Sequence, residues 1–399
     1  MTKKNSAFFK FLIVLLSLFI LCCDDSEPPP EPPIPPVPPP PPSKYQIAAL
    51  KIADYLLGQQ NIDGAIPDAP GWDTVNEDSN MEYALIGFAA AYEYSQDGKY
   101  LTAMERGINW LAEREEMTDE NWRGSWYYAF SATPPYNPVQ VSVGPGISNV
   151  RGVDATSALF VYLLYLHSKL SGSRSLADKY ELNAKAALDF LLSHNISKDG
   201  YFYSSWHKWK SDDRWHLWRF CYTADQADVY LGLQAGWLLY GDQVYETPAA
   251  KLKEKVCSQF FSVSDGRFAL GLEEDGSLCL DFEGFNGTFP QGYLPWVFQQ
   301  NSENEAAFAW LSLCVQTDGS LICYEGDPGY SLNVALYALA ASSLNYPQPD
   351  KSLTWILDTT LDPTDGGVRD SSEPNSEKFS NVAGFTIMAM LQFETQLHN

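Results

Sequence analysis

FLLSHNISKDGYF, residues Phe190 to Phe202, reads as the end of a helix, a short polar tract and an Asp-Gly turn. The same order returns in YLLGQQNIDGAIP at Tyr55 to Pro67, and in more divergent form at four further places. The glycines that mark the copies lie 47 to 76 residues apart: Gly64, Gly124, Gly200, Gly266, Gly319 and Gly366. A repeat of that length holds two helices and two connections, and one copy cannot bury its apolar face alone. Glycine is also expected where a helix ends in a left-handed turn, so Asp-Gly is first a helix stop signal.

The helical segments between these markers are of two kinds. Leu176 to His194 and Ala249 to Phe261 are amphipathic, with charge on one side. The other kind is apolar nearly all round and must be surrounded by protein; it comprises Glu82 to Tyr94, Asp154 to Leu170, Gln226 to Tyr240, Leu332 to Leu344 and Ala383 to Leu391. In the fourth unit we expect the inner helix at Gln291 to Gln300, interrupted by Pro295.

Six hairpins of one buried and one exposed helix predict an all-α fold, an (α/α)6 toroid formed by residues 44–399, with short β-hairpins in its connections. Ser277 to Phe282 is one such strand-like piece. An open helical solenoid is the alternative. In this layout the chain resembles the six-hairpin superfamily, which includes many glycoside hydrolases, some polysaccharide lyases and the terpenoid-cyclase-like toroids. The resemblance lies in the repeat and not in a diagnostic motif, since DxDD and a thioester motif are both absent.

The N-terminus predicts export. Three lysines lie within residues 1–10, an apolar run follows from Phe11 to Leu21, and Cys22 and Cys23 come next. A basic start and a short apolar segment are typical of a signal peptide, here residues 1–23. The cysteines resemble a bacterial lipobox, so we expect a lipid anchor on Cys22 or Cys23; a plain secretory signal is the alternative. Residues 24–43 form a proline-rich stalk, with twelve prolines between Pro28 and Pro42.

Composition excludes several classes of protein. The formal net charge is -24, which argues against nucleic acid, because phosphates require clustered Lys and Arg. The cysteines that follow the anchor pair form no CxxC pair, so a metal knuckle is not expected. No GxSxG, HExxH, P-loop or dinucleotide fingerprint occurs, and we expect neither a cofactor nor a metal. We expect a monomer.

The most unusual connection is YFYSSWHKWKSDDRWHLWRFCYTADQAD, Tyr201 to Asp228. Its many rings cannot all be buried singly, so it either lines a cleft or fills the mouth of the helical barrel. The long connections of all units should meet at one rim, above the N-termini of the inner helices. Rings that stack on sugars beside polar groups that bind hydroxyls indicate a carbohydrate site. The candidate binding residues are Trp72, Trp126, Trp206, His207, Trp209, Trp215, His216, Trp218, Arg219, Tyr222, Glu283, Trp296 and Tyr330.

Three aspartates are the candidate catalytic groups. Cleavage of a glycosidic bond requires two carboxyl groups that face each other across the sugar. We expect Asp154 and Asp225, each near the start of an inner helix, to form this pair, with Asp228 supporting Asp225 from the same helix face. Alternatively, each of these aspartates could have a structural role only and stabilise the N-terminus of its helix. Glu82 is set aside because Ser79-x-x-Glu82 predicts a capping box.

Two other functions fit the same residues. A polysaccharide lyase that acts on uronic acids needs cations and a Tyr or His base, which Lys208, His216, Arg219 and Tyr222 would provide. A glycan-binding lipoprotein without activity needs only the aromatic rim. The carboxylates Asp73, Glu77 and Asp78 could hold calcium, but they lack the spacing of a calcium loop.

Overall fold

The computed structural model describes residues 41–141 and 143–397. The expected signal peptide, with Cys22 and Cys23, and nearly all of the proline-rich stalk lie outside these residues. The chain divides into two units at Pro42, and the helices and sheets below all belong to the unit Ser43–Asn399. Within the described ranges, no helix is long and apolar enough to cross a membrane.

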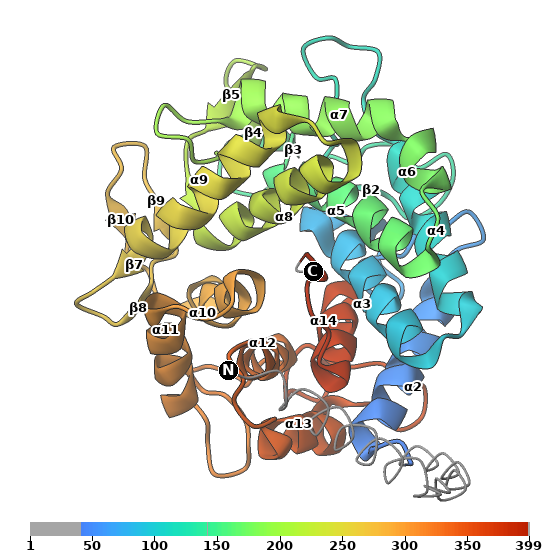
Figure 1. Cartoon of the computed structure of the whole chain (residues 1–399), viewed down its shortest axis with the longest axis vertical. Coiled ribbons are helices and arrows are strands. Elements are labelled where there is room, and N and C mark those ends of the chain that lie inside the picture. The colour runs from blue at the N-terminus through green and yellow to red at the C-terminus, as the bar shows by residue number, and fades with distance from the viewer. Residues whose placement is uncertain (1–40, 142, 398–399) are drawn as a thin grey trace, which may run out of the picture. The chain divides into compact units, whose positions relative to one another are not determined.

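The inner helices form a closed ring (Figure 1). They are α3 (Asn80–Ser95), α5 (Asp154–Ser171), α8 (Thr223–Tyr240), α10 (Gly284–Phe298), α12 (Ser331–Ser343) and α14 (Ser380–Leu391). Each packs against the next in chain order, and the last, α14, packs extensively against the first, α3. The (α/α)6 toroid is therefore confirmed, and the open solenoid is wrong.

The outer helices lie between neighbouring inner ones. They are α2 (Lys44–Gln59), α4 (Gly98–Ala112), α6 (Ser175–Lys179) with α7 (Glu181–Phe190) and the π-turn η3 (Leu191–Asn195), α9 (Gln243–Gln259), α11 (Ser302–Leu313), and α13 (Asp350–Trp355) with the π-turn η4 (Ile356–Thr360). Helix α2 packs on both α3 and α14, so the first outer helix covers the joint where the ring closes.

The repeated Asp-Gly turns connect the outer helix of each unit with the inner helix of that unit. All six marker glycines have positive φ. A Cβ on Gly124 would lie 2.0 Å from the carbonyl oxygen of Ala186 in α7, and one on Gly366 would lie 3.0 Å from that of Lys51 in α2. At these two places the turn lies directly against the outer helix of the following unit, and the Gly366 contact joins the sixth unit to the first. Glycine is needed there for close approach as well as for its left-handed backbone.

Backbone hydrogen bonds join the connections of neighbouring units at the N-terminal rim. The amide of Asp154 at the start of α5 donates to the carbonyl oxygen of Ser204 at 2.9 Å, and the amide of Ser380 at the start of α14 donates to that of Asp68 at 2.9 Å. Bonds of this kind satisfy helix N–H groups that lack a partner within the helix. They also fix each long connection beside the next, which places their side chains around one opening.

The strands are short and lie in these connections, as expected. The largest sheet has the antiparallel order β3 (Ile147–Arg151), β4 (Ser205–Trp209) and β5 (Trp215–Trp218). A second sheet joins β10 (Leu278–Cys279), β9 (Gly271–Leu272) and β6 (Cys221–Tyr222), and two pairs complete the set: β1 (Thr74–Val75) with β2 (Phe130–Ser131), and β7 (Phe261–Ser262) with β8 (Arg267–Phe268).

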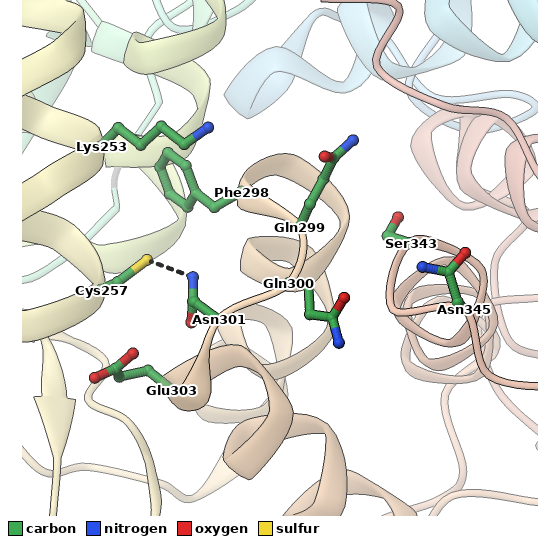
Figure 2. Close-up of a pocket in the computed structure, with 9 residues that line it drawn as sticks. All are labelled: Lys253, Cys257, Phe298, Gln299, Gln300, Asn301, Glu303, Ser343 and Asn345. Carbon is green, nitrogen blue, oxygen red and sulfur yellow. Dashed lines mark hydrogen bonds between the residues drawn. The ribbon is translucent and has the colours of Figure 1, made fainter. Parts of the chain in front are cut away.

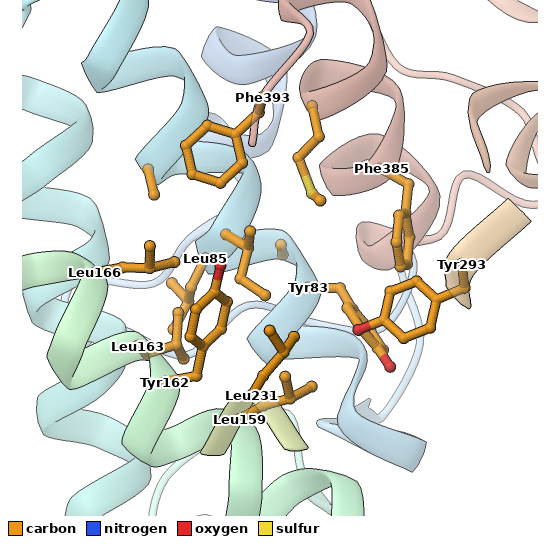
Figure 3. Close-up of a cluster of buried hydrophobic side chains, with 14 of the residues drawn as sticks. Tyr83, Leu85, Leu159, Tyr162, Leu163, Leu166, Leu231, Tyr293, Phe385 and Phe393 are labelled. Carbon is orange, nitrogen blue, oxygen red and sulfur yellow. The ribbon is translucent and has the colours of Figure 1, made fainter. Parts of the chain in front are cut away.

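Buried rings fill the axis of the toroid. Tyr83 and Tyr293 approach edge to face with centroids 6.2 Å apart, and both contact Phe385 (Figure 3). Near the C-terminal ends of the inner helices, the indole N–H of Trp296 donates to the carbonyl oxygen of Phe393 at 2.8 Å, and Phe393 is itself buried. The described part of the segment after α14 thus packs against the C-terminal end of α10.

Two expected elements differ in their bounds. The fourth inner helix begins at Gly284 instead of Gln291, and it contains Pro290 and Pro295. Packing against α8 and α12 holds this helix despite its low propensity. The outer segment expected from Leu176 to His194 is interrupted at Tyr180, which separates α6 from α7.

Candidate functional site

A cavity of about 560 Å³ opens at the N-terminal ends of the inner helices. Residues from five units line it, in the connections and the first turns of the inner helices, among them Asp78, Tyr128, Tyr222, Phe289 and Asn381. Its walls are largely apolar, with a few polar groups that converge at the helix N-termini. This composition is typical of a site for a small ligand.

One face of the β4–β5 hairpin forms an aromatic wall of this cavity. His207, Trp209 and Trp218 line it, and the two indoles are 39% and 37% exposed. Trp218 stacks on Phe220 at 5.6 Å and lies 4.8 Å from His207. Because these rings are fixed by their neighbours yet open to the cavity, they can stack on a sugar.

The opposite face of the same hairpin turns away from the cavity. Trp206 and Trp215 contact Trp122 there, with centroids at 5.5 and 5.3 Å, and the Arg151 guanidinium lies over the Trp122 ring at 4.3 Å. Side chains alternate between the two faces of a strand. The four tryptophans of the hairpin are thus divided into a cavity pair and an outer pair.

Asp154 and Asp225 lie in hydrogen-bond contact with each other. Burial and the Asp225 charge hold the pKa of Asp154 well above its usual range. Burial and the charge of Asp78 raise the pKa of Asp225 to about 7, although Asp154 and Ser204 donate hydrogen bonds to it. The two were expected to oppose each other across the mouth. The structure instead places the two carboxyl groups next to each other, and Asp225 lines the cavity.

Asp228 lies one turn deeper on α8 and is fully buried. The Tyr83 hydroxyl donates to its carboxylate at 2.9 Å, and the Tyr293 hydroxyl also donates to it. Burial raises the pKa of Asp228 well above its usual range. Figure 3 shows Tyr83 and Tyr293 with their hydroxyl groups close together. Asp228 therefore fixes two aromatic side chains, one of which, Tyr83, reaches the cavity.

Asp78 approaches the cavity from a different unit, at the short turn η2 (Glu77–Ser79). Its side chain is exposed to the cavity opening. Desolvation by the surrounding protein and the charge of Glu77 raise the pKa of Asp78 to about 6. The sequence placed this residue among the rim carboxylates and the possible calcium ligands, but not among the candidate catalytic groups. Its position just before an inner helix was the available signal, because the first turns of these helices line the axis.

His207 is the histidine among the cavity residues. It is 5% exposed, and its Nε2 lies 3.1 Å from the Ser205 hydroxyl oxygen. Burial lowers its pKa to about 4. The imidazole is therefore neutral at pH 7, and it is a hydrogen-bonding group and not a cation.

Some candidate binding residues are placed elsewhere. Trp126 and Trp296 are 1% exposed, and their indole N–H groups donate to Leu111 and Phe393 within the core, so their assignment as sugar platforms was wrong. A tryptophan of a repeat unit can pack into the core or lie at the rim. The sequence does not distinguish these two positions. Trp72, Glu283 and Tyr330 lie in connections, but they are not among the residues that line the cavity.

Lys208, His216 and Arg219 are not among the residues that line the cavity. Arg219 pairs with Glu274, Lys208 with Asp213 at 2.8 Å, and His216 with Asp212 at 2.9 Å. The described residues that line the cavity include no Lys or Arg. Of the four residues considered for a lyase, Tyr222 alone is among them.

The capping box expected at Ser79 and Glu82 does not form. Ser79 is left-handed and makes no capping bond, while Glu82 is buried and accepts a hydrogen bond from the Asn76 side chain at 3.1 Å. Burial raises the pKa of Glu82 to about 8. Asp73, Glu77 and Asp78 form no metal site: within residues 41–141 and 143–397, no group of three or more His, Cys, Asp or Glu could hold an ion.

A second cavity, of about 430 Å³, lies beside the C-terminal ends of α10 and α12 (Figure 2). It is lined mainly by amides and hydroxyls, including Gln299, Gln300 and Asn301, whose side chain donates to the Cys257 sulfur at 3.3 Å. Phe298 is its aromatic residue and Glu303 its carboxylate. With one carboxylate and one ring, it is a weaker candidate for chemistry than the rim cavity.

No protein-family model matches the chain, and no curated protein matches it. Solved structures do. A D-mannose isomerase is 14% identical over 88% of this chain and 97% of its own, with a TM-score of 0.67. A cellobiose 2-epimerase from Bacillus thermoamylovorans is 11% identical over 86% and 97%, with a TM-score of 0.64. A glycosidase in complex with glucose is 14% identical over 89% and 98%, with a TM-score of 0.60. These likenesses show that the chain shares the (α/α)6 toroid fold of these proteins.

Proposed function

We propose that the rim cavity binds a carbohydrate and hydrolyses a glycosidic bond. The observation that supports this most is Asp225, a carboxyl group at the cavity surface whose pKa is raised to about 7. A general acid works best when its pKa lies near the working pH. The aromatic wall of Trp209 and Trp218 supplies a stacking surface at the same place.

The pair of Asp154 and Asp225 can supply the proton that the leaving group needs. Burial raises the pKa of both carboxyl groups, which favours a proton on the pair at the cavity. Protonation of the glycosidic oxygen by Asp225 turns the departing sugar into a neutral alcohol. Asp154, behind it, is a positioning residue.

The substrate that fits this cavity is an uncharged glycan. A lyase acting on uronic acids has to neutralise the substrate carboxylate, and Arg219 and Lys208 are paired with Glu274 and Asp213 and do not line the cavity. This arrangement favours hydrolysis over elimination.

Isomerisation is the second candidate, because two of the similar folds are a sugar isomerase and an epimerase. That chemistry requires a base that removes a proton from carbon. His207 has a pKa of about 4 and is a weak base. Carboxyl groups with a raised pKa are better suited to donating a proton to oxygen, so hydrolysis is preferred.

A screen of residues 43–399 against neutral and acidic oligosaccharides tests the proposal. Reducing ends report hydrolysis, ultraviolet absorbance reports an unsaturated uronide, and separation of the sugars reports isomers. We expect new reducing ends alone, from a neutral glycan, and their loss in Asp225→Asn. Isomers or ultraviolet absorbance would contradict hydrolysis. Binding without any product would indicate a glycan-binding protein without activity.

We also propose that the protein is lipid-anchored outside the cytoplasmic membrane through Cys22 or Cys23. An export signal that ends in cysteine supports this. Fatty-acid labelling of the full chain should be lost in the double variant Cys22→Ser, Cys23→Ser. Equal labelling of both proteins would contradict the anchor.

A further inference from the structure

The turn that presents Asp78 has an unusual backbone. Asn76, Asp78 and Ser79 all lie in the left-handed region, with φ of 61°, 52° and 66°. None is a glycine, and side chains make this conformation unfavourable. Three such residues within four positions persist only where the surrounding structure holds them.

Buried polar contacts hold the residues on either side of Asp78. The Asn76 side chain accepts from the amide of Met81 at 3.1 Å and donates to Glu82 at 3.1 Å. The Ser79 hydroxyl lies 2.9 Å from that of Thr156 on α5. Asn76, Ser79, Glu82 and Thr156 are all buried.

A second contact fixes the outer side of the turn. Asp68 accepts from the amide of Glu77 at 3.0 Å and from the Asn80 side chain at 3.2 Å. Asp68 is fully buried. The turn is therefore held at both ends by side chains from its own connection and from α5.

Asp78 itself takes no part in these contacts. The Glu77 charge raises its pKa, and the charge of Asp78 in turn raises the pKa of Asp225. Its side chain lines the cavity, as does Asp225, which lies at the start of α8, two units further along the ring. The strained turn thus holds at the cavity a carboxylate that takes no part in the hydrogen bonds of the turn.

We propose that Asp78 is the second catalytic carboxyl group of the rim cavity and acts as the general base opposite Asp225. This inference rests on the proposed hydrolysis. Asp225 gives its proton to the glycosidic oxygen as the bond from that oxygen to the anomeric carbon breaks. A water molecule attacks the anomeric carbon, and its proton passes to the Asp78 carboxylate. Exchange with solvent then returns both groups to their starting states.

Two variants of Asp78 separate a catalytic role from a structural one. Asp78→Asn should lower kcat by at least about 100-fold. Asp78→Gly should lower it equally, yet raise the melting temperature, because glycine adopts φ of 52° without strain. If Asp78 only supported the fold, Asp78→Gly would instead have a lower melting temperature than the wild-type protein. Asp73→Asn, an exposed carboxylate of the same connection, is the matched control and should leave kcat unchanged.

The leaving group distinguishes the base from the acid. The probes are the oligosaccharide that the wild-type protein cleaves and the 2,4-dinitrophenyl glycoside of its terminal sugar. Asp78→Asn should lose activity on both, whereas Asp225→Asn should retain activity on the activated glycoside, whose leaving group needs no proton.

These measurements, made on the full chain, have separate outcomes. If the wild-type protein cleaves neither probe nor any glycan of the panel, the proposed hydrolysis fails and the role of Asp78 with it. If the wild-type protein cleaves a glycan and Asp78→Asn retains kcat within about threefold, the role of Asp78 alone is contradicted.

Discussion

Gly87 of α3 and Gly384 of α14 lie backbone to backbone: a Cβ on Gly87 would come within 2.7 Å of the Gly384 Cα. A Cβ on Gly384 would come within 2.3 Å of the Tyr83 carbonyl oxygen. The first and last inner helices therefore meet without side chains between them. Because Tyr83 also donates to Asp228 and lines the cavity, ring closure and the shape of the site depend on the same contact.

Replacement of Gly384 by alanine should disturb this contact between α3 and α14. We expect Gly384→Ala to lower the free energy of unfolding by about 2–4 kcal/mol, because the added methyl group meets backbone that cannot move freely. Gly58→Ala is the control: it lies in helix α2 with no atom near its added Cβ, and it should stabilise by about 0.5–1 kcal/mol. Urea denaturation of both variants checks the prediction. Equal changes in the free energy of unfolding for the two variants would contradict it.

The two faces of the β4–β5 hairpin should behave differently toward sugar. Trp209→Ala and Trp218→Ala remove rings that line the cavity and should weaken oligosaccharide binding about three- to tenfold. Trp206→Ala and Trp215→Ala remove rings of the outer face and should leave the affinity unchanged while lowering stability. Isothermal titration calorimetry tests this prediction. A loss of affinity only in the outer-pair variants would contradict it, because the sugar would then lie on the opposite face of the sheet.

The pH profile of hydrolysis should be bell-shaped. Asp225, with a pKa of about 7, must be protonated to act as the acid, so kcat/KM should fall as the pH rises above 7. Asp78, with a pKa of about 6, must be ionised to act as the base, so kcat/KM should fall below pH 6. Rates measured from pH 4 to 9 test both limbs. A profile that stays flat across this range would exclude these two groups from the reaction.

Glu115, which follows α4 and contacts Asn183 of α7, should make stability depend on pH. It is 7% exposed, and burial raises its pKa to about 9, even though the Asn183 side chain donates to it at 2.7 Å. The folded protein then binds this proton more tightly than the unfolded chain, whose glutamate has its ordinary pKa. The contribution of Glu115 to the free energy of unfolding therefore falls as the pH rises from about 4.5 toward 9.

Glu115→Gln removes this penalty and keeps the hydrogen bond from Asn183. We expect the variant to be more stable than wild type by about 2–4 kcal/mol at pH 8 and nearly equal to it at pH 4. Glu113→Gln, an exposed neighbour, should change little at either pH. Denaturation curves at both pH values provide the test, and a gain that does not vary with pH would show that Glu115 is not protonated in the folded state.

The sequence was sufficient to predict the fold because one local signal recurs. Each Asp-Gly turn follows an outer helix, and its glycine has positive φ in the structure. The close approach of Gly124 to α7 and of Gly366 to α2 could not be predicted, because it depends on how the units pack.

The site was predicted less completely. Strand alternation could have separated Trp206 from Trp209, but the faces depend on which side β4 turns toward the axis. The contact between Asp154 and Asp225 depends on the spacing of α5 and α8 in the ring, which no local pattern encodes. In place of the expected capping box, Ser79 contacts Thr156 and Glu82 accepts from Asn76.

The most direct test is a crystal structure of Asp225→Asn with the neutral oligosaccharide that the wild-type protein cleaves. We expect the sugar to lie in the rim cavity, stacked on Trp209 or Trp218, with its scissile bond between Asp78 and residue 225. A sugar bound instead against Trp206 and Trp215, or in the cavity beside Gln299, would contradict the account.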